Sequence, residues 1–231
     1  MPESATTSGP AAPQAERRLA AVLSLIAGMV DVTGFLSLGS LFTAHITGNL
    51  VVIAALVVRG GPVNLAQVLA IPVFILAVAG AWLLARASAD RGRRQVRRFL
   101  LVQFLLLTTV LVFSVVTRPS AHPHGLTAGI AAMIAVCAMA CQFALFRLAL
   151  PGGPSTAVMT GNLTNTVLAL LDKAAPPTPS AANDAGRTDT SLHLIVSFFA
   201  GCVAGGAAVS ALGDWAWSLP TSLAALAIAL Q

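Results

Sequence analysis

The chain has few charged residues. Only 9% of its 231 residues are Asp, Glu, Lys or Arg, whereas 57% are hydrophobic, and the mean hydropathy is +0.86. A soluble domain carries about 25% charged residues, because polar groups must cover its surface. This composition excludes a cytosolic enzyme, a nucleic-acid binder and a disordered protein. Apolar blocks of roughly 20 residues recur along the chain, so the lipid bilayer is its expected main partner.

Residues for catalysis or metal binding are also scarce. The three cysteines, at positions 137, 141 and 202, lie inside apolar blocks and have no disulfide or zinc spacing. No nucleotide-binding loop, Ser-His-Asp set or pair of catalytic carboxylates is present, and the H-x-H of His122 and His124 has no further ligands beside it. We therefore expect no enzyme activity, no catalytic residue, no cofactor and no metal site.

Six apolar blocks predict membrane-spanning helices, since each supplies most of the ~20 residues that a span needs. Two more apolar segments, residues 41–58 and 155–171, are interrupted by Thr, Gly and Asn. Residues 1–16 are polar and predict a disordered tail, residues 87–98 form a basic loop, and the Pro-rich residues 173–190 predict a mobile loop. The six blocks are residues 19–39, 67–85, 99–116, 126–146, 192–212 and 216–230.

The two interrupted segments belong to an internal repeat. The triplet Thr-Gly-Asn at 47–49 recurs at 160–162, and HITGNLVVIAAL aligns with VMTGNLTNTVLAL. The order of span, TGN segment, span and span then occurs twice, which is typical of a repeat architecture. We divide the chain into a tail (1–16) and one membrane domain with two repeats, residues 17–117 and 118–231.

The basic residues predict the topology. If both TGN segments are re-entrant and the N-terminus is cytoplasmic, 11 of the 13 basic residues lie on the cytoplasmic side and only Arg59 and Arg118 lie outside. Eight full spans would divide them almost evenly, so the positive-inside rule favours six spans and two re-entrant segments. Because each repeat has an odd number of spans, three, the second half is inverted in the membrane relative to the first. Both termini are then cytoplasmic.

These motifs resemble a known family. GMVDVTGFLSLGSLFTAHITGN, followed by ACQFALF and STAVMTGNLTN, is similar to the YoaK-like family of bacterial inner-membrane proteins, which is described by a domain of unknown function. The resemblance covers nearly all of residues 19–230. It implies a multi-pass protein of the bacterial plasma membrane without an established activity. His45 departs from the apolar residue that this family often has before T-G-N, so any role of His45 is peculiar to this chain.

Asp31 is the only acidic residue inside an apolar block. A carboxylate at mid-span costs about 2.5–3.5 kcal/mol on insertion scales, so its environment must compensate for the charge. Asp31 is either a proton, cation or substrate site or a hydrogen-bonded residue that fastens the first span to a neighbour. Gln142 occupies the matching place in the second repeat, where its amide can hydrogen-bond but cannot titrate. His45 could titrate near neutral pH or be structural.

The TGN motifs are the second candidate site. We expect each to precede a short apolar helix, with Thr or Asn as its N-cap and with free N–H groups facing the membrane midplane. Such helix ends hold anionic substrates in transporters, although the motifs could equally be structural. The inverted repeat predicts that Asn49 and Asn162 approach within about 10–12 Å, one helix diameter. The six residues are Thr47, Gly48, Asn49, Thr160, Gly161 and Asn162.

The sequence thus predicts an all-α integral membrane protein with about six transmembrane helices and two short re-entrant TGN segments in an inverted repeat. Its expected function is transport of a small solute or ion through a midplane site. The alternative is a membrane scaffold or accessory subunit in which the TGN motifs are purely structural. The sequence leaves the solute unidentified and a homo-oligomer open.

The topology can be tested by cysteine labelling in intact cells, with the three native cysteines replaced. A cysteine introduced at Ser88, in the basic loop, should be shielded from an impermeant reagent, because this loop is cytoplasmic by the positive-inside rule. Cysteines at Ser40 and Gly61 should both react from outside if the first TGN segment is re-entrant. External labelling at Ser88 would refute this orientation.

Overall fold

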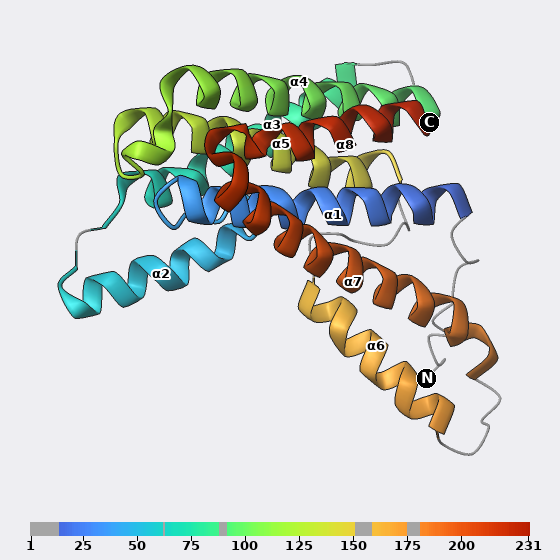
Figure 1. Cartoon of the computed structure of the whole chain (residues 1–231). Helices are drawn as coiled ribbons and strands as arrows, with labels where there is room; N and C mark the ends of the chain where they lie inside the picture. The colour runs from blue at the N-terminus through green and yellow to red at the C-terminus, as the bar shows by residue number, and fades with distance from the viewer. Residues whose placement is uncertain (1–13, 62, 88–91, 151–158, 175–180) are drawn as a thin grey trace.

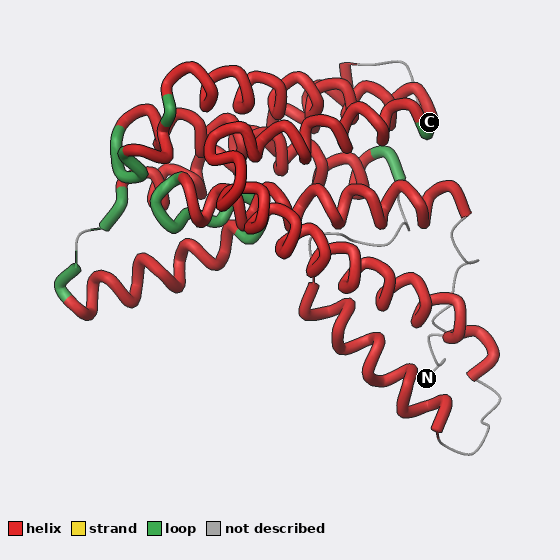
Figure 2. Tube along the Cα trace, in the orientation of Figure 1, coloured by secondary structure: helices red, strands yellow, loops and turns green. Residues whose placement is uncertain are grey.

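The chain folds into a helical bundle in a computed structural model that describes residues 14–61, 63–87, 92–150, 159–174 and 181–231. All regular structure in these ranges is helical (Figure 2). This confirms the all-α prediction for the described part. The helices are α1 (Gln14–Ser37), α2 (Ile46–Arg59), α3 (Leu65–Ala87), α4 (Arg93–Thr117), η1 (Pro119–Ala121), α5 (Leu126–Leu148), α6 (Met159–Ala174), α7 (Ala181–Leu212), η2 (Gly213–Trp217) and α8 (Ser218–Ala229).

Five stretches are long and apolar enough to cross a membrane. Four of them are the helices α1, α3, α4 and α5, which coincide with the first four predicted spans. The fifth, Thr190–Ala229, contains the last two predicted spans, which η2 separates into α7 and α8. α8 has only 12 residues, about 18 Å of helix at 1.5 Å per residue. Membrane character is therefore supported, whereas the count of six crossings stays a prediction.

Three predicted non-helical stretches are shorter than expected. The prediction of a basic loop at 87–98 was wrong for its second half, because α4 begins at Arg93. Arginine has a high helix propensity. The tail at 1–16 overlaps α1, which begins at Gln14. The loop predicted over 173–190 is helical at both ends, in α6 and α7. The rest of these stretches, residues 1–13, 88–91 and 175–180, lies outside the described residues.

The helices alternate in direction. In Figure 1, α1, α4 and α7 start at the end of the bundle where the chain's C-terminus lies, and α3, α5 and α8 run back toward it. α2 leaves the bundle toward the end where α1 finishes, whereas α6 lies along α7 and points the opposite way (Figure 1). The basic ends of α1 and α4 share one end of the bundle, and Arg59 ends α2 at the other.

Among the described helices, α1 and α7 make the most extensive contact. A Cβ atom added at Gly201 would clash with the carbonyl oxygen of Leu25, and one added at Gly28 would clash with that of Phe198. Gly205 meets the backbone of Met29 in the same way. Small residues allow such backbone contact, so the Gly201-x-x-x-Gly205 stripe of α7 packs directly on the backbone of α1.

Gly201→Ala should destabilise the protein by about 1–3 kcal/mol, because an added methyl group would overpack backbone that cannot move aside easily. The measurement is reversible unfolding in detergent micelles. Gly80→Ala in α3 is the matched control, since nothing lies within 4 Å of its added Cβ. This control should be neutral or slightly stabilising, because Gly within a helix costs about 0.5–1 kcal/mol relative to Ala. Equal stability of the two variants would contradict the tight α1–α7 crossing.

Candidate functional site at the start of α2

Asp31 of α1 holds the start of α2. Its Oδ1 atom accepts the backbone N–H groups of Thr43 and Ala44, both at 2.8 Å, and lies 3.4 Å from the N–H of His45. These three residues precede the first turn of α2, where N–H groups have no helical acceptor. Successive N–H groups converging on one point form an anion-binding nest. The carboxylate, only 4% exposed, occupies that nest.

The second oxygen of Asp31 pairs with His45. Oδ2 lies 2.7 Å from Nδ1 of the imidazole. With the carboxylate ionised, Nδ1 carries the hydrogen of this bond, which leaves Nε2 facing away. The His45 side chain is 34% exposed and that of Asp31 only 5%. The histidine is therefore the accessible member of the pair.

The loop between α1 and α2 turns the chain back toward the middle of α1. Gly39 and Ser40 end α1 with positive φ angles of +77° and +57°, and the Ser40 N–H donates to the Phe35 carbonyl at 3.1 Å. Side chains near the start of α3 then fasten this turn. Asn64 and Gln67 donate to the carbonyls of Gly39 and Ser40 at 3.2 and 2.9 Å. Because Asp31 lies inside α1, α2 begins alongside that helix.

Asn49 is a structural clamp. Its Oδ1 accepts the N–H of Phe42 at 2.9 Å, and its Nδ2 donates to the Phe42 carbonyl at 2.8 Å. The side chain is fully buried and is the only buried one on α2. Both functional atoms of the amide thus bind the peptide of the loop.

The TGN motif lies inside the first turn of α2, not before it. The N-cap is His45, which makes no side-chain capping bond, so the expectation that Thr or Asn caps this helix was wrong. Asp31 of α1 instead accepts the N–H groups of Thr43 and Ala44, which precede the helix. Gly48 packs on the Phe42 ring, 3.0 Å from where a Cβ would stand, and Thr47 is exposed. Of this motif, Gly48 and Asn49 shape the loop.

The second motif also starts a helix, since Thr160, Gly161 and Asn162 lie in the first turn of α6. Asn162 is 8% exposed, and its carbonyl accepts the hydroxyl of Thr166 at 2.9 Å. The loop before α6, residues 151–158, lies outside the described residues. The predicted approach of Asn49 and Asn162 stays a prediction. α2 and α6 make no extensive contact within the described part of the chain.

Gln142 is fully buried in α5 but does not reproduce the role of Asp31. Its Oε1 accepts a hydrogen bond from Gln103 of α4 at 2.7 Å, and its Nε2 donates to the Leu23 carbonyl of α1 at 2.9 Å. The amide therefore links three helices. It adds no charge to the bundle, and it does not line the pocket beside Asp31.

A pocket of about 350 Å³ opens beside the Asp31–His45 pair. It lies between α1, the loop before α2, and α7, whose Phe198 ring stands 5.1 Å from the His45 ring. The other walls are apolar apart from the Cys202 thiol. The lining residues are Asp31, Val32, Phe35, Leu36, Phe42, His45, Phe198 and Cys202.

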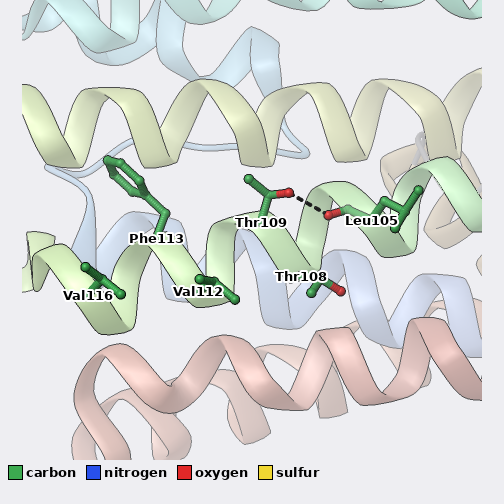
Figure 3. Close-up of a pocket in the computed structure, with 6 residues that line it drawn as sticks. All are labelled: Leu105, Thr108, Thr109, Val112, Phe113 and Val116. Carbon is green, nitrogen blue, oxygen red and sulfur yellow. Dashed lines mark hydrogen bonds between the residues drawn. The ribbon is translucent and has the colours of Figure 1, made fainter.

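A second pocket, of about 480 Å³, lies against the outside of α4 and has no chemistry of this kind. Its six lining residues all come from α4 (Figure 3). The hydroxyls of Thr108 and Thr109 donate to the carbonyls of Phe104 and Leu105, each at 2.8 Å. Both hydroxyl hydrogens are therefore already bonded within α4. This surface is apolar and suits lipid chains, and the candidate site is the pocket at α2.

Sequence reasoning treated Asp31 and His45 as separate candidates, and the structure pairs them. It missed the aromatic and thiol walls, namely Phe35, Phe42, Phe198 and Cys202. No spacing in the sequence indicates these residues, because Phe198 and Cys202 reach the site only through the α1–α7 crossing. The position of His45 two residues before Thr47, where an apolar residue is usual, was the one available signal.

The comparisons with known proteins give a family but no activity. A family model described as "Protein of unknown function (DUF1275)" matches residues 19–230. No curated protein and no solved structure matches the chain.

Asn49→Ala should lower stability, because the N–H and carbonyl of Phe42 lose their partners and a buried unpaired group costs about 1–3 kcal/mol. The measurement is the thermal unfolding temperature of the purified protein in detergent. Thr47→Ala is the matched control, since Thr47 is exposed two positions earlier on the same helix. A fall in stability for both variants, or for neither, would argue against the clamp.

Proposed function

The chain belongs to the DUF1275 family of proteins of unknown function, and we propose that it is a multi-pass membrane transporter for a small solute or ion. Its substrate site would be the pocket beside Asp31 and His45. The paired TGN motifs, which the sequence suggested as the site, would shape the loops around it.

The proposed topology places the basic end of the bundle in the cytoplasm. The N-terminal end of α1 and the start of α4 carry the arginines at 17, 18, 93, 94, 97 and 98, and both lie at that end. An excess of Lys and Arg favours the cytoplasmic side. α2 and α6 would then be re-entrant from opposite faces, and α1–α4 and α5–α8 would form the inverted halves. This arrangement matches a bacterial plasma membrane protein with both termini inside.

A single observation carries the transport proposal. A buried carboxylate meets the start of a short helix next to a pocket of about 350 Å³, and it shares a hydrogen bond with a partly exposed histidine. Ionisable residues at membrane depth are rare and usually mark substrate, ion or proton pathways. Broken helices that begin near the midplane are typical of transporters.

A scaffold or accessory subunit is the second candidate, and a specific observation favours it. Asn49 and Gln142 use both of their polar side-chain atoms on neighbouring residues. These parts of the repeat therefore look structural. They do not explain why the site also contains an accessible histidine and an open pocket, so we place transport first.

Flux into proteoliposomes tests the proposal, with a panel of cationic, anionic and neutral solutes. Wild type should transport at least one class, and Asp31→Asn should reduce that flux by about tenfold or more, which corresponds to about 1.4 kcal/mol. Asparagine can still accept the N–H groups of Thr43 and Ala44, so the loop should hold while the charge is lost.

Two further variants separate function from folding. Asp31→Leu cannot accept those N–H groups, so it should reduce the amount of protein in the membrane. Gln142→Asn retains a buried amide away from the pocket and should change flux much less than Asp31→Asn. Wild-type flux in Asp31→Asn would remove Asp31 from the transport mechanism. An absence of flux for every solute would favour the scaffold.

A further inference from the structure

The Asp31 carboxylate makes the pocket unfavourable for anions. The N–H groups of Thr43 and Ala44, in the loop just before α2, already donate to Asp31 Oδ1 at 2.8 Å. An anion entering the pocket would find these donors filled and would meet the carboxylate's negative charge. Like charges at close range repel strongly where water is excluded.

The pocket also lacks the ligands for a divalent metal ion. Calcium takes six to eight oxygen ligands and magnesium requires near-octahedral oxygen coordination. Asp31 is the only carboxylate on the described pocket wall, and both of its oxygens already accept hydrogen bonds or pair with His45. No group of three or more His, Cys, Asp and Glu residues that could hold a metal occurs in the described parts of the chain.

The remaining walls favour an organic cation. Phe35, Phe42 and Phe198 line the pocket, and the first two rings have their centroids 4.9 Å apart. Aromatic faces attract cations, with quaternary ammonium groups as the usual ligands of aromatic cages. Val32 and Leu36 supply apolar surface for the carbon groups of such a ligand. The volume of about 350 Å³ lies at the small end of the range for ligand pockets.

The net charge of the pocket depends on whether His45 is protonated. An ionised Asp31 beside a protonated His45 has no net charge, whereas loss of the histidine proton leaves one negative charge. A buried net charge is costly unless it is paired, so either a proton on His45 or a bound cation can neutralise the site. His45 Nε2 has no hydrogen bond to any described residue, so a proton can reach it from the pocket. Cys202 of α7 is the one other titratable side chain on the described wall.

We infer that the pocket between α1, α7 and the start of α2 binds a small organic cation and exchanges it for the proton carried by His45. This inference rests on the proposed transport function and names its substrate class and coupling. The exchange is electroneutral, with one cation entering as one proton leaves His45. The Asp31 carboxylate is the partner of the proton in one state and of the cation in the other.

The experiment uses proteoliposomes with a pH-sensitive dye in the lumen and tetraethylammonium as the probe. This cation has no ionisable proton, so any proton movement must come from the protein. Tetraethylammonium uptake should make the lumen more alkaline, with one proton leaving per cation. Its affinity should fall by up to about tenfold for each pH unit below the range in which His45 titrates, the limit for one competing proton.

His45→Gln tests the coupling, because glutamine is polar and cannot titrate in this range. This variant should bind tetraethylammonium with an affinity independent of pH and should release no proton. His122→Gln is the matched control, since His122 is exposed at the far end of η1 and its side chain is not part of the pocket. It should behave as wild type. Thermal unfolding with and without tetraethylammonium measures binding separately from flux, because a ligand that binds the native state stabilises it.

The outcomes separate the two hypotheses. Flux of neutral or anionic solutes without tetraethylammonium flux would overturn the cation exchange and leave transport standing. Proton release by His45→Gln equal to that of wild type would also overturn it. If no solute moves and tetraethylammonium does not raise the unfolding temperature, both the transport function and the exchange fail.

Discussion

The hydrogen bonds between Asp31 and the start of α2 are the interaction on which the site depends. A helix that begins within an apolar region leaves N–H groups without acceptors, and each unsatisfied group costs several kcal/mol in lipid. A buried carboxylate is similarly unfavourable when it has no partner. The N–H groups of Thr43 and Ala44, just before α2, and the imidazole of His45 give the carboxylate its partners, and the carboxylate in turn fixes the loop that leads into α2. The Asp31 carboxylate in α1 and the N–H groups of the loop before α2 therefore stabilise each other.

The glycine crossing of α1 and α7 completes the pocket around that charge. Gly28 and Gly201 bring the two backbones into contact, which places Phe198 and Cys202 of α7 beside Asp31 and His45. Bulkier residues at the crossing would separate α7 from α1 and open this wall. Packing between two helices and the chemistry of the loop are thus linked, although the glycines themselves bear no functional group.

The two TGN-containing parts of the sequence differ in their chemistry. The first half carries the charged pair, and Asn49 holds the loop that presents it. In the second half Gln142, the counterpart of Asp31, joins α1, α4 and α5 through neutral hydrogen bonds. The charged Asp31 lies beside the pocket at the start of α2, whereas the neutral Gln142 joins helices away from that pocket.

The sequence by itself determined the apolar, all-helical character, four long apolar helices to within about six residues at their ends, and the buried Asp31, because hydropathy and the cost of a lone charge in lipid are local properties. It could not determine that Asp31 pairs with His45, that Asn49 clamps Phe42, or that Gln142 bonds to α1 and α4. These contacts depend on how the chain turns at Gly39 and Ser40 and on how the helices cross. Only the tertiary structure decides them, since hydrogen bonds join whichever groups packing brings within about 3 Å.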